Sequence, residues 1–472
     1  MRFCLIKSLS NEEKFERKFQ IVSKKVNKKQ SFVKEKRVFE KYCVKKEKGM
    51  NKRKEVLVLG FALFAMFFGA GNLIFPPSVG INMGDNWLLA GLGFLLTGVG
   101  LPLLGVLAFT KVGELENFST KVSKFFNNAY CSVLVLVIGP LFAIPRTGST
   151  TIEMGVLPAL SNMDKFTVTV VSSVIFFAVT LLLVIKESKI TDIIGKFLTP
   201  IILVILLAIT VLGVTGDLGT PVHKVESGMF AFGFIQGYQT MDALASVLFG
   251  VVIVKGLKGK GIEDSHEQSG YLTGAGVIAA IGLGLIYFSL MYLGARISGV
   301  ENSAATTASA LYIAEATLGS IGKMAFGICV AAACLTTSVG LVALTSDWFS
   351  RITPFSYKTI AVATCVFSSV MAIGGVDFII QLSVPVLCIL YPITIVLILF
   401  NVFGLENELA YKAGVYITLL ISIVETLGVT FKIGAFTNAV QLIPLGKDGF
   451  AWLVPCVIVT AVAFAFSRKA TK

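Results

Sequence analysis

Twelve long apolar runs, separated by short polar breaks, dominate this sequence. Most are roughly 18–25 residues long, the length that an α-helix needs to cross a bilayer. Of the 472 residues, 55% are hydrophobic and only 15% are charged, whereas soluble domains carry about 25% charged residues. We therefore expect an all-α integral membrane protein that has the lipid bilayer as a partner. The runs lie at 55–79, 86–110, 130–158, 166–186, 190–213, 227–254, 271–295, 322–346, 356–374, 377–401, 412–431 and 449–467.

Positive charge between the runs predicts the orientation. An even number of spans puts both termini on one side, and cytoplasmic segments carry the excess of Lys and Arg. With the termini in the cytoplasm, inner segments from Met50 onward hold 18 Lys and Arg, and outer loops hold 6. We therefore expect both termini to be cytoplasmic. The longest outer loop, 296–321, includes small residues at 303–310 that fit a short external helix, either a lid or a plain surface helix.

The first 49 residues differ from the rest of the chain. They hold 16 Lys and Arg against 6 Asp and Glu, which is +10 of the net charge of +13. Such a segment could bind anionic lipid or nucleic acid. The composition favours a disordered extension instead. Met50 is followed by a short basic stretch and then by the first apolar run, which is typical of a cytoplasmic start. We expect a basic extension at 1–49, with Met50 as a possible true start, and a polytopic transporter domain at 50–472.

The first span contains a predicted helix break. Gly69 and Gly71 loosen the helix, and Asn72 adds a polar group at mid-depth. Pro76 and Pro77 follow and are expected to end the regular hydrogen-bond ladder. Irregular backbone inside a membrane is tolerated where it lines a cavity or meets a ligand. The freed N–H groups would attract a carboxylate and the freed carbonyls a cation, although a glycine pair can also serve close helix packing.

The sixth span carries a second interruption. Residues 233–242 combine two glycines, two glutamines and Asp242 within an otherwise apolar segment. If spans 1–5 and 6–10 form a repeat, spans 1 and 6 occupy matching positions in two inverted halves. Interrupted helices at matching positions are the best sequence indication of a transporter's midplane site. Asp242 is the intramembrane charge that we select, with capping of the freed N–H groups as its structural alternative.

Other polar groups inside the spans are weaker candidates. The hydroxyl groups of Thr336 and Thr337 in the eighth span could bind Na⁺, which prefers oxygen ligands. They could equally bond back to carbonyls of their own helix. Arg146 and Glu153 in the third span lie two turns apart, too far for a direct i,i+4 bridge. We expect Glu425 in the eleventh span to be structural.

Motifs of enzymes and metal sites are absent from the sequence. Both histidines, His223 and His266, fall in loops, and the eight cysteines form no C-x-x-C pair. There is no H-E-x-x-H and no P-loop, which excludes an ATP-driven pump. We expect a protein that is not an enzyme and has no cofactor.

Two motifs carry a family resemblance. G-A-G-N-L-I-F-P-P at Gly69–Pro77 and G-Y-Q-T-M-D-A-L-A at Gly237–Ala245 resemble signatures of the bacterial branched-chain amino acid carriers. These are the LIVCS family of the amino acid–polyamine–organocation superfamily, and the similarity runs from about Met50 to the C-terminus. The resemblance implies the leucine-transporter type fold, with a 5+5 inverted repeat, broken helices 1 and 6 and two additional helices. It also implies a place in the bacterial inner (cytoplasmic) membrane. We expect no nucleic acid and no obligatory protein partner.

The resemblance also implies a substrate site. The substrate carboxylate would meet backbone N–H groups around Ala70 and Gly71. The break at Gly237, Tyr238 and Gln239 would face the amino group and the side chain. The predicted substrate-binding set is Gly69, Ala70, Gly71, Asn72, Gly237, Tyr238, Gln239 and Asp242.

Span 8 is similar to the ion-site pattern of related sodium symporters, A-x-L-T-[ST], present at residues 333–337. Some proton-coupled relatives place a lysine from span 5 in that site. Thr199 stands at the corresponding position here, with Lys196 three residues earlier, which favours Na⁺ over H⁺. The implied Na⁺ ligands are Ala65, Phe68, Ala333, Thr336 and Thr337.

Together these observations predict a Na⁺-driven importer of Leu, Ile and Val. An H⁺-coupled carrier of the same substrates is one alternative. Another is a superfamily relative that transports a different small zwitterion or a nucleobase. A channel or a membrane sensor is a more distant alternative.

Overall fold

The computed structural model describes residues 52–185, 190–299 and 306–470, without the side chains of 190–200, 202 and 468–470. The predicted extension at 1–49 lies outside the described residues. The chain divides into two units, residues 1–57 and 58–472, and the account below concerns the second unit. Residues 52–57 are the described part of the first unit and begin the helix Lys52–Phe67.

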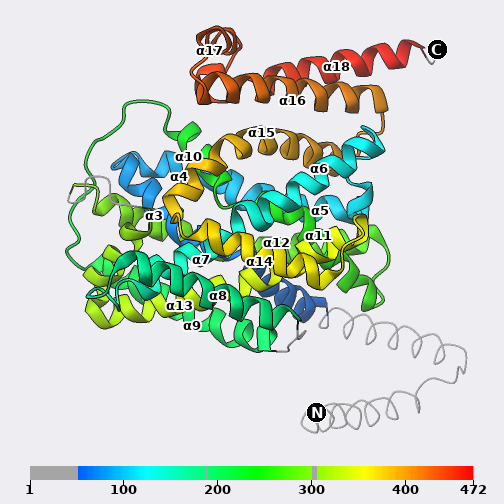
Figure 1. Ribbon diagram of the computed structural model, residues 1–472. Coiled ribbons are helices and arrows are strands. Elements are labelled where there is room, and N and C mark those ends of the chain that lie inside the picture. The colour runs from blue at the N-terminus through cyan, green and yellow to red at the C-terminus, as the bar shows by residue number, and fades with distance from the viewer. Residues whose placement is uncertain (1–51, 186–189, 300–305, 471–472) are drawn as a thin grey trace, which may run out of the picture. The chain divides into compact units, whose positions relative to one another are not determined.

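The described residues form helices joined by turns, with an isolated β-bridge between Gly84 and His223 (Figure 1). After the helix Lys52–Phe67, the elements are α3 (Gly71–Met83), α4 (Trp87–Leu95), η1 (Leu96–Gly100), α5 (Leu101–Val112), η2 (Leu115–Asn117), α6 (Lys124–Leu136), η3 (Val137–Leu141), α7 (Ala143–Thr151), η4 (Ile152–Val156), α8 (Lys165–Ile185), α9 (Ile190–Thr215), α10 (Met229–Tyr238), α11 (Asp242–Gly259), α12 (Ser265–Arg296), α13 (Thr306–Ile352), α14 (Tyr357–Ala372), α15 (Val376–Phe403), α16 (Glu408–Thr430), α17 (Gly434–Gln441), η5 (Gly446–Asp448) and α18 (Leu453–Ala470).

Each of the twelve predicted spans coincides with a helix or a pair of helices. Among the described residues, seven helices are long and apolar enough to cross a membrane, and two bent pairs raise the number to nine. The other three spans correspond to shorter apolar helices, namely Leu203–Thr215 within α9, α14, and Leu453–Ser467 within α18. The predicted all-α membrane fold is confirmed.

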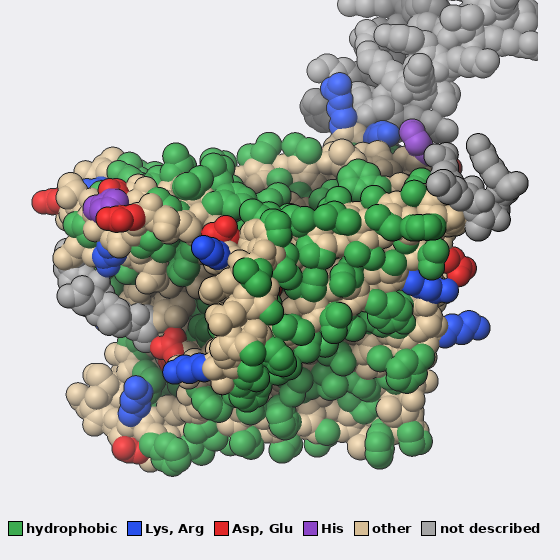
Figure 2. Space-filling model, turned by 90° about the horizontal axis from the view of Figure 1, so that it is seen from above, with side chains coloured by type: hydrophobic (Ala, Val, Ile, Leu, Met, Phe, Trp, Pro, Cys, Tyr) green, Lys and Arg blue, Asp and Glu red, His purple; other side chains and the backbone are tan. Residues whose placement is uncertain are grey.

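The surface of these helices is apolar. Large hydrophobic side chains point outward on several spans, for example Leu182 on α8, Leu207 on α9 and Leu285 on α12, all more than half exposed. Figure 2 shows one face covered by hydrophobic side chains, with charged groups mainly near its edges. Exposing such an apolar surface to water is unfavourable, whereas contact with lipid is not, so these side chains are expected to face the bilayer.

The two broken spans pack against unbroken spans in a reciprocal way. Span 1 lies along α12, which is span 7, through contacts of α3 with α12. Span 6 lies along span 2, since α10 contacts α4 and α11 contacts α5. If the two halves match, span 1 corresponds to span 6 and span 2 to span 7, so the contact of span 1 with span 7 corresponds to that of span 6 with span 2. This correspondence is what a 5+5 inverted repeat requires.

Glycines make these contacts close. A Cβ on Gly233 of α10 would lie 1.8 Å from the Ala90 carbonyl oxygen of α4, and one on Gly294 of α12 would lie 2.1 Å from that of Pro77. Backbone therefore meets backbone, as in small-residue seams between membrane helices.

Gly233→Ala is expected to lower the melting temperature of the purified protein by several degrees, because overpacking costs about 1–3 kcal/mol. Gly256→Ala is the matched control, since its Cβ would meet nothing within 4 Å. Melting followed by size-exclusion chromatography in detergent measures both variants. Equal melting temperatures for the two would contradict the tight α10–α4 seam.

A carboxylate joins the third span to the segment before span 8. Gly319, at φ 67°, separates residues 306–318 from the rest of α13, so the expected short helix is present over these residues, while 303–305 lie outside the described part. The Glu153 carboxylate of η4 accepts hydrogen bonds from the Thr307 hydroxyl at 2.6 Å and from the Val376 N–H at 2.9 Å. The Thr306 hydroxyl donates to Asp377 at 2.9 Å. The short helix is thus attached to the start of α15.

Candidate substrate and ion site

Span 1 is broken at Phe68–Ala70, where its two helices meet at 69°. The Gly69 N–H donates to the side-chain oxygen of Asn72 at 3.3 Å instead of continuing the helix. Within the described residues, the carbonyls of Ala65 and Phe68 accept no hydrogen bond, and the Ala70 N–H finds no acceptor. The break therefore presents free acceptors and a free donor.

The break is not caused by the prolines. We expected Pro76 and Pro77 to end the ladder, but α3 continues through both to Met83, so that expectation was wrong. The helix tolerates them because they lie only six and seven residues into α3. The carbonyls that lose a donor belong to its first turn, where neighbouring groups can compensate.

Span 6 is broken at Gln239–Met241, where α10 and α11 meet at 46°. Met241 adopts a left-handed conformation with φ 60°, which is uncommon for a residue other than glycine. Thr240 stabilises the turn, since its hydroxyl donates to the Gly237 carbonyl at 2.9 Å and accepts from the Asp242 N–H at 3.3 Å.

A direct contact joins the two breaks. The Asn72 amide nitrogen donates to the Asp242 carboxylate at 2.6 Å and also to the Tyr287 hydroxyl of α12. All three side chains are at most 6% exposed. Met241 holds the N-cap position of α11, and the Asp242 carboxylate of the first turn is bound to Asn72 of span 1.

Arg146 reaches the same region from span 3. It lies in α7, after a kink at Gly139–Phe142, and its Nη1 donates to the Gln239 carbonyl at 2.6 Å. The Ser383 hydroxyl of α15 donates to the side-chain oxygen of Gln239 at 3.2 Å. Spans 1, 3, 6, 7 and 10 therefore meet around one polar centre.

Two of the predicted substrate residues have a different position from the one expected. Gly237 and Tyr238 still belong to α10, and the break starts one residue later. Gly237 lies against Thr97 and the Phe94 carbonyl of span 2, so helix packing accounts for this glycine. The Tyr238 ring stacks on Tyr391 with centroids 4.1 Å apart.

The predicted ion ligands come from two elements, span 1 and the part of α13 that forms span 8. Thr337 lies beside the break of span 1, with its hydroxyl 3.6 Å from where a Gly69 Cβ would be. The Thr336 hydroxyl donates to the Ala333 carbonyl at 2.9 Å, which is the expected alternative of a bond back to its own helix. The lone pairs of the Thr336 oxygen stay available to a cation. The free carbonyl of Phe68 lies in the same break, and that of Ala65 lies in the last turn of the helix before it. Neutral oxygens of this kind fit a hard monovalent cation.

Other ion chemistry has less support. In the described part of the chain, His, Cys, Asp and Glu form no group of three or more that could hold a metal ion. The side chains of Lys196 and Thr199, which entered the comparison with proton-coupled carriers, lie outside the described residues.

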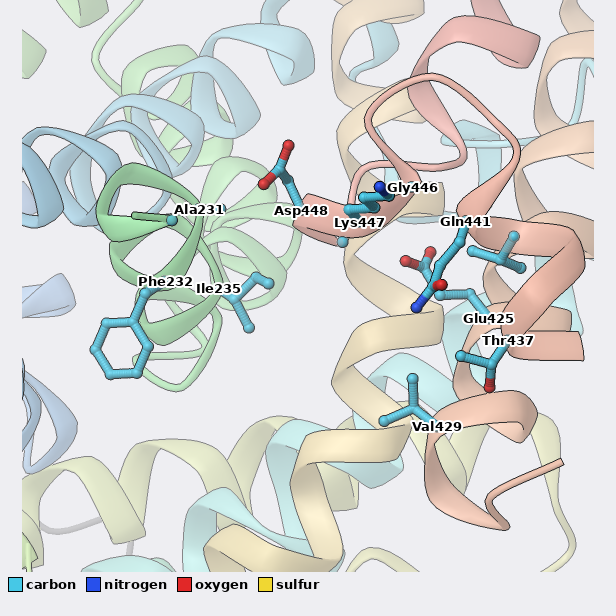
Figure 3. A pocket seen from close by; sticks show the side chains of 13 residues that line it. Ala231, Phe232, Ile235, Glu425, Val429, Thr437, Gln441, Gly446, Lys447 and Asp448 are labelled. Atoms are coloured by element: carbon cyan, nitrogen blue, oxygen red, sulfur yellow. The ribbon is translucent and has the colours of Figure 1, made fainter. Parts of the chain in front are cut away.

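A separate pocket of about 360 Å³ lies between α10, α16, α17 and η5. Figure 3 shows Ile235 of α10 on one side and Glu425 and Gln441 on the other. None of the predicted substrate or ion residues lines it. Glu425 is therefore a pocket residue and lies outside the centre formed by the two breaks.

Sequence reasoning missed three contributors to this centre. Arg146 was visible as a costly charge inside a span, but nothing in the sequence showed that it reaches Gln239. Tyr287 and Ser383 carried no signal, because hydroxyl groups are common in membrane helices.

The fold and the paired breaks define a multi-span transporter of the leucine-transporter type. The structure is similar to Mhp1 in an inward-facing conformation, with a TM-score of 0.58 and 12% identity over 88% of this chain and 91% of that one. It is also similar to the closed conformation of Mhp1, a nucleobase-cation-symport-1 family transporter, with bromovinylhydantoin bound. There the TM-score is 0.56 and the identity 10%, over 88% and 93% of the two chains.

The chain belongs to the branched-chain amino acid transport protein family, which it matches over residues 52–470. It is 39% identical to the branched-chain amino acid permease BraB of Bacillus subtilis, over 88% of this chain and 96% of the relative. It is 37% identical to the branched-chain amino acid transport system 2 carrier protein of Pseudomonas aeruginosa, and 34% identical to the permease BrnQ of Escherichia coli K12, each over the same shares of both chains. The family is one of transport proteins and not of enzymes, and the predicted membership is confirmed.

Proposed function

We propose that this chain imports Leu, Ile and Val by symport with Na⁺. The observation that carries the proposal is the bond between Asn72 and Asp242, which places a free N–H end and a carboxylate at one centre. A zwitterionic amino acid needs both groups. The relatives named as branched-chain amino acid permeases and carriers support this substrate class.

Each part of the substrate has a proposed partner. The Ala70 N–H and the N-terminus of α3 would receive the carboxylate, and Asp242 would receive the ammonium group. The aliphatic side chain would lie among apolar and aromatic neighbours near Tyr238. Discrimination among Leu, Ile and Val should be modest, because one methylene is worth about 1–3 kcal/mol.

Na⁺ is a co-transported substrate in this proposal. Its ligands would be the carbonyls of Ala65, Phe68 and Ala333 and the hydroxyls of Thr336 and Thr337. Because Phe68 lies in the same break as Ala70, an ion there would help to fix the backbone that receives the carboxylate. Binding of the ion would therefore favour binding of the amino acid, and the reverse.

The cellular setting is also a proposal. The bacterial relatives support a place in the bacterial cytoplasmic membrane, and the excess of Lys and Arg on one side supports cytoplasmic termini. Residues 50–472 would form the transporter domain and residues 1–49 a basic extension.

Uptake of labelled isoleucine into vesicles that contain the full chain tests the proposal. An inward Na⁺ gradient is compared with an equal K⁺ gradient at fixed pH, and empty vesicles are the control. We expect accumulation above equilibrium only with Na⁺. Accumulation driven instead by a pH gradient would assign the coupling to H⁺ with the same substrate. No accumulation under either gradient, or no competition by unlabelled leucine, would contradict the substrate class.

A further inference from the structure

Arg146 is a buried cation that the account of ion coupling does not use. It is 4% exposed, and its guanidinium lies over the Phe75 ring of α3, 5.2 Å from the centroid. Nη1 is bound to the Gln239 carbonyl at 2.6 Å. A charge inside a membrane span is costly and marks a functional site by default. A hydrogen bond to one carbonyl offsets little of this cost, so a further role for Arg146 is expected.

The other end of the guanidinium faces the break of span 1. A Cβ on Gly71 would lie 3.2 Å from Nη2 of Arg146 and 3.4 Å from the Cα of Thr240. Even a methyl group would be tight there, so Gly71 allows the guanidinium and the backbone of the second break to approach the first break closely. The free N–H of Ala70 belongs to the residue next to Gly71, and Nη2 therefore lies close to this N–H group.

The charges of the polar centre indicate which ligand it would bind. The polar centre holds one guanidinium, Arg146, and one carboxylate, Asp242, and the latter is held by Asn72. A zwitterion brings one charge of each sign. Its carboxylate matches Arg146 and the positive N-terminal end of α3, whereas its ammonium group matches Asp242.

We propose that Arg146 is a substrate-binding residue, whose Nη2 binds the carboxylate of the transported amino acid while Nη1 stays on the Gln239 carbonyl. This inference rests on the proposed function and adds a residue to that site. One guanidinium then contacts the ligand at the break of span 1 and the backbone at the break of span 6. Through this guanidinium, binding of the substrate at the first half of the repeat would affect the backbone of the second half.

Binding of leucine is compared with binding of leucinol, in which a hydroxymethyl group replaces the carboxylate. The full chain is purified in detergent with Na⁺, and the affinity for each ligand is measured by competition with bound labelled isoleucine. This readout does not require transport. The wild-type protein should prefer leucine to leucinol strongly. Arg146→Gln should reduce this preference about tenfold, which is 1.4 kcal/mol, and Arg146→Lys should retain part of it.

Arg296→Gln is the matched control. Arg296 also donates to backbone carbonyls, those of Gly213, Val214 and Gly219, but it lies at the end of α12, away from the breaks. Its loss should leave the ratio of leucine to leucinol affinity unchanged. If Arg146→Gln does not fold, Gly71→Ala decides, because its Cβ would lie only 3.2 Å from Nη2. The guanidinium would have to move away from the first break, which should lower the same ratio.

Equal losses of leucine and leucinol affinity in Arg146→Gln would overturn the inference, since Arg146 would then act only by positioning Gln239. An unchanged ratio in Gly71→Ala would overturn it in the same way. A wild-type protein that binds neither ligand would overturn the proposed function itself. The two failures are therefore distinguishable.

Discussion

Replacing Thr336 and Thr337 together by alanine should raise the Na⁺ concentration for half-maximal isoleucine uptake at least about thirtyfold. The change removes two of the five proposed oxygen ligands, and a thirtyfold loss corresponds to about 2 kcal/mol. Isoleucine affinity at saturating Na⁺ should change much less, because Ala70 and Asp242 are untouched. Uptake into vesicles at graded Na⁺ concentrations, with constant ionic strength, measures both effects.

Two controls make this experiment specific. Thr336→Ser with Thr337→Ser retains both hydroxyls and should keep most of the Na⁺ affinity. Thr418→Ala removes a buried hydroxyl that donates back to its own helix, to the Gly414 carbonyl at 2.7 Å, as Thr336 does to Ala333. It lies in α16 and should leave Na⁺ activation unchanged. Normal Na⁺ activation in the double alanine variant would refute the ion site.

Asp242→Asn should reduce isoleucine transport about a hundredfold or more. The carboxylate accepts a short bond from Asn72 in a buried centre, and hydrogen bonds to a charged group are roughly twice as strong as neutral ones. Removing the charge also leaves the buried Arg146 guanidinium without the carboxylate of the same polar centre, which makes burial of its charge more costly. The proposed ammonium site is lost as well. Initial rates in vesicles, normalised to the amount of folded protein, measure the effect.

Glu425→Gln is the matched control for Asp242→Asn. It removes another carboxylate from a membrane span, but one that lines the separate pocket of Figure 3. Its transport rate should stay within about twofold of wild type, since surface and non-site substitutions usually have small effects. Near wild-type transport by Asp242→Asn would assign Asp242 a purely structural role.

The sequence predicted the spans well because their signal is strong and local. In lipid, a stretch such as 166–186 must be helical to satisfy its own backbone, so hydropathy and length suffice. Both helix breaks were also predictable, since glycines next to polar residues at mid-depth are typical of interrupted membrane helices. The position of the first break was less predictable. Pro76 and Pro77 looked like the end of a helix but lie within α3.

The partners at the site could not be predicted because they depend on contacts between distant segments. Asn72 and Asp242 were selected separately, yet nothing in either motif indicates that they bond across 170 residues. Gly237 was selected as part of a break, although its close contact with Thr97 gives it a packing role. Arg146 was visible as a charge but had no visible partner. Such contacts become apparent only when the five spans are assembled.

The attachment of residues 306–318 has a consequence for the salt conditions under which this protein works. The bonds from Thr307 to Glu153 and from Thr306 to Asp377 each join an uncharged hydroxyl to a carboxylate, whereas Glu315 of the same segment forms an ion pair with Lys323 further along α13. Dissolved ions screen pairs of opposite charges beyond about 8 Å at physiological ionic strength and weaken exposed ones further as salt rises. A hydroxyl donor has no net charge to screen. Rising salt should therefore weaken the pair between Glu315 and Lys323 but leave the attachment of the segment to the start of α15 largely unchanged.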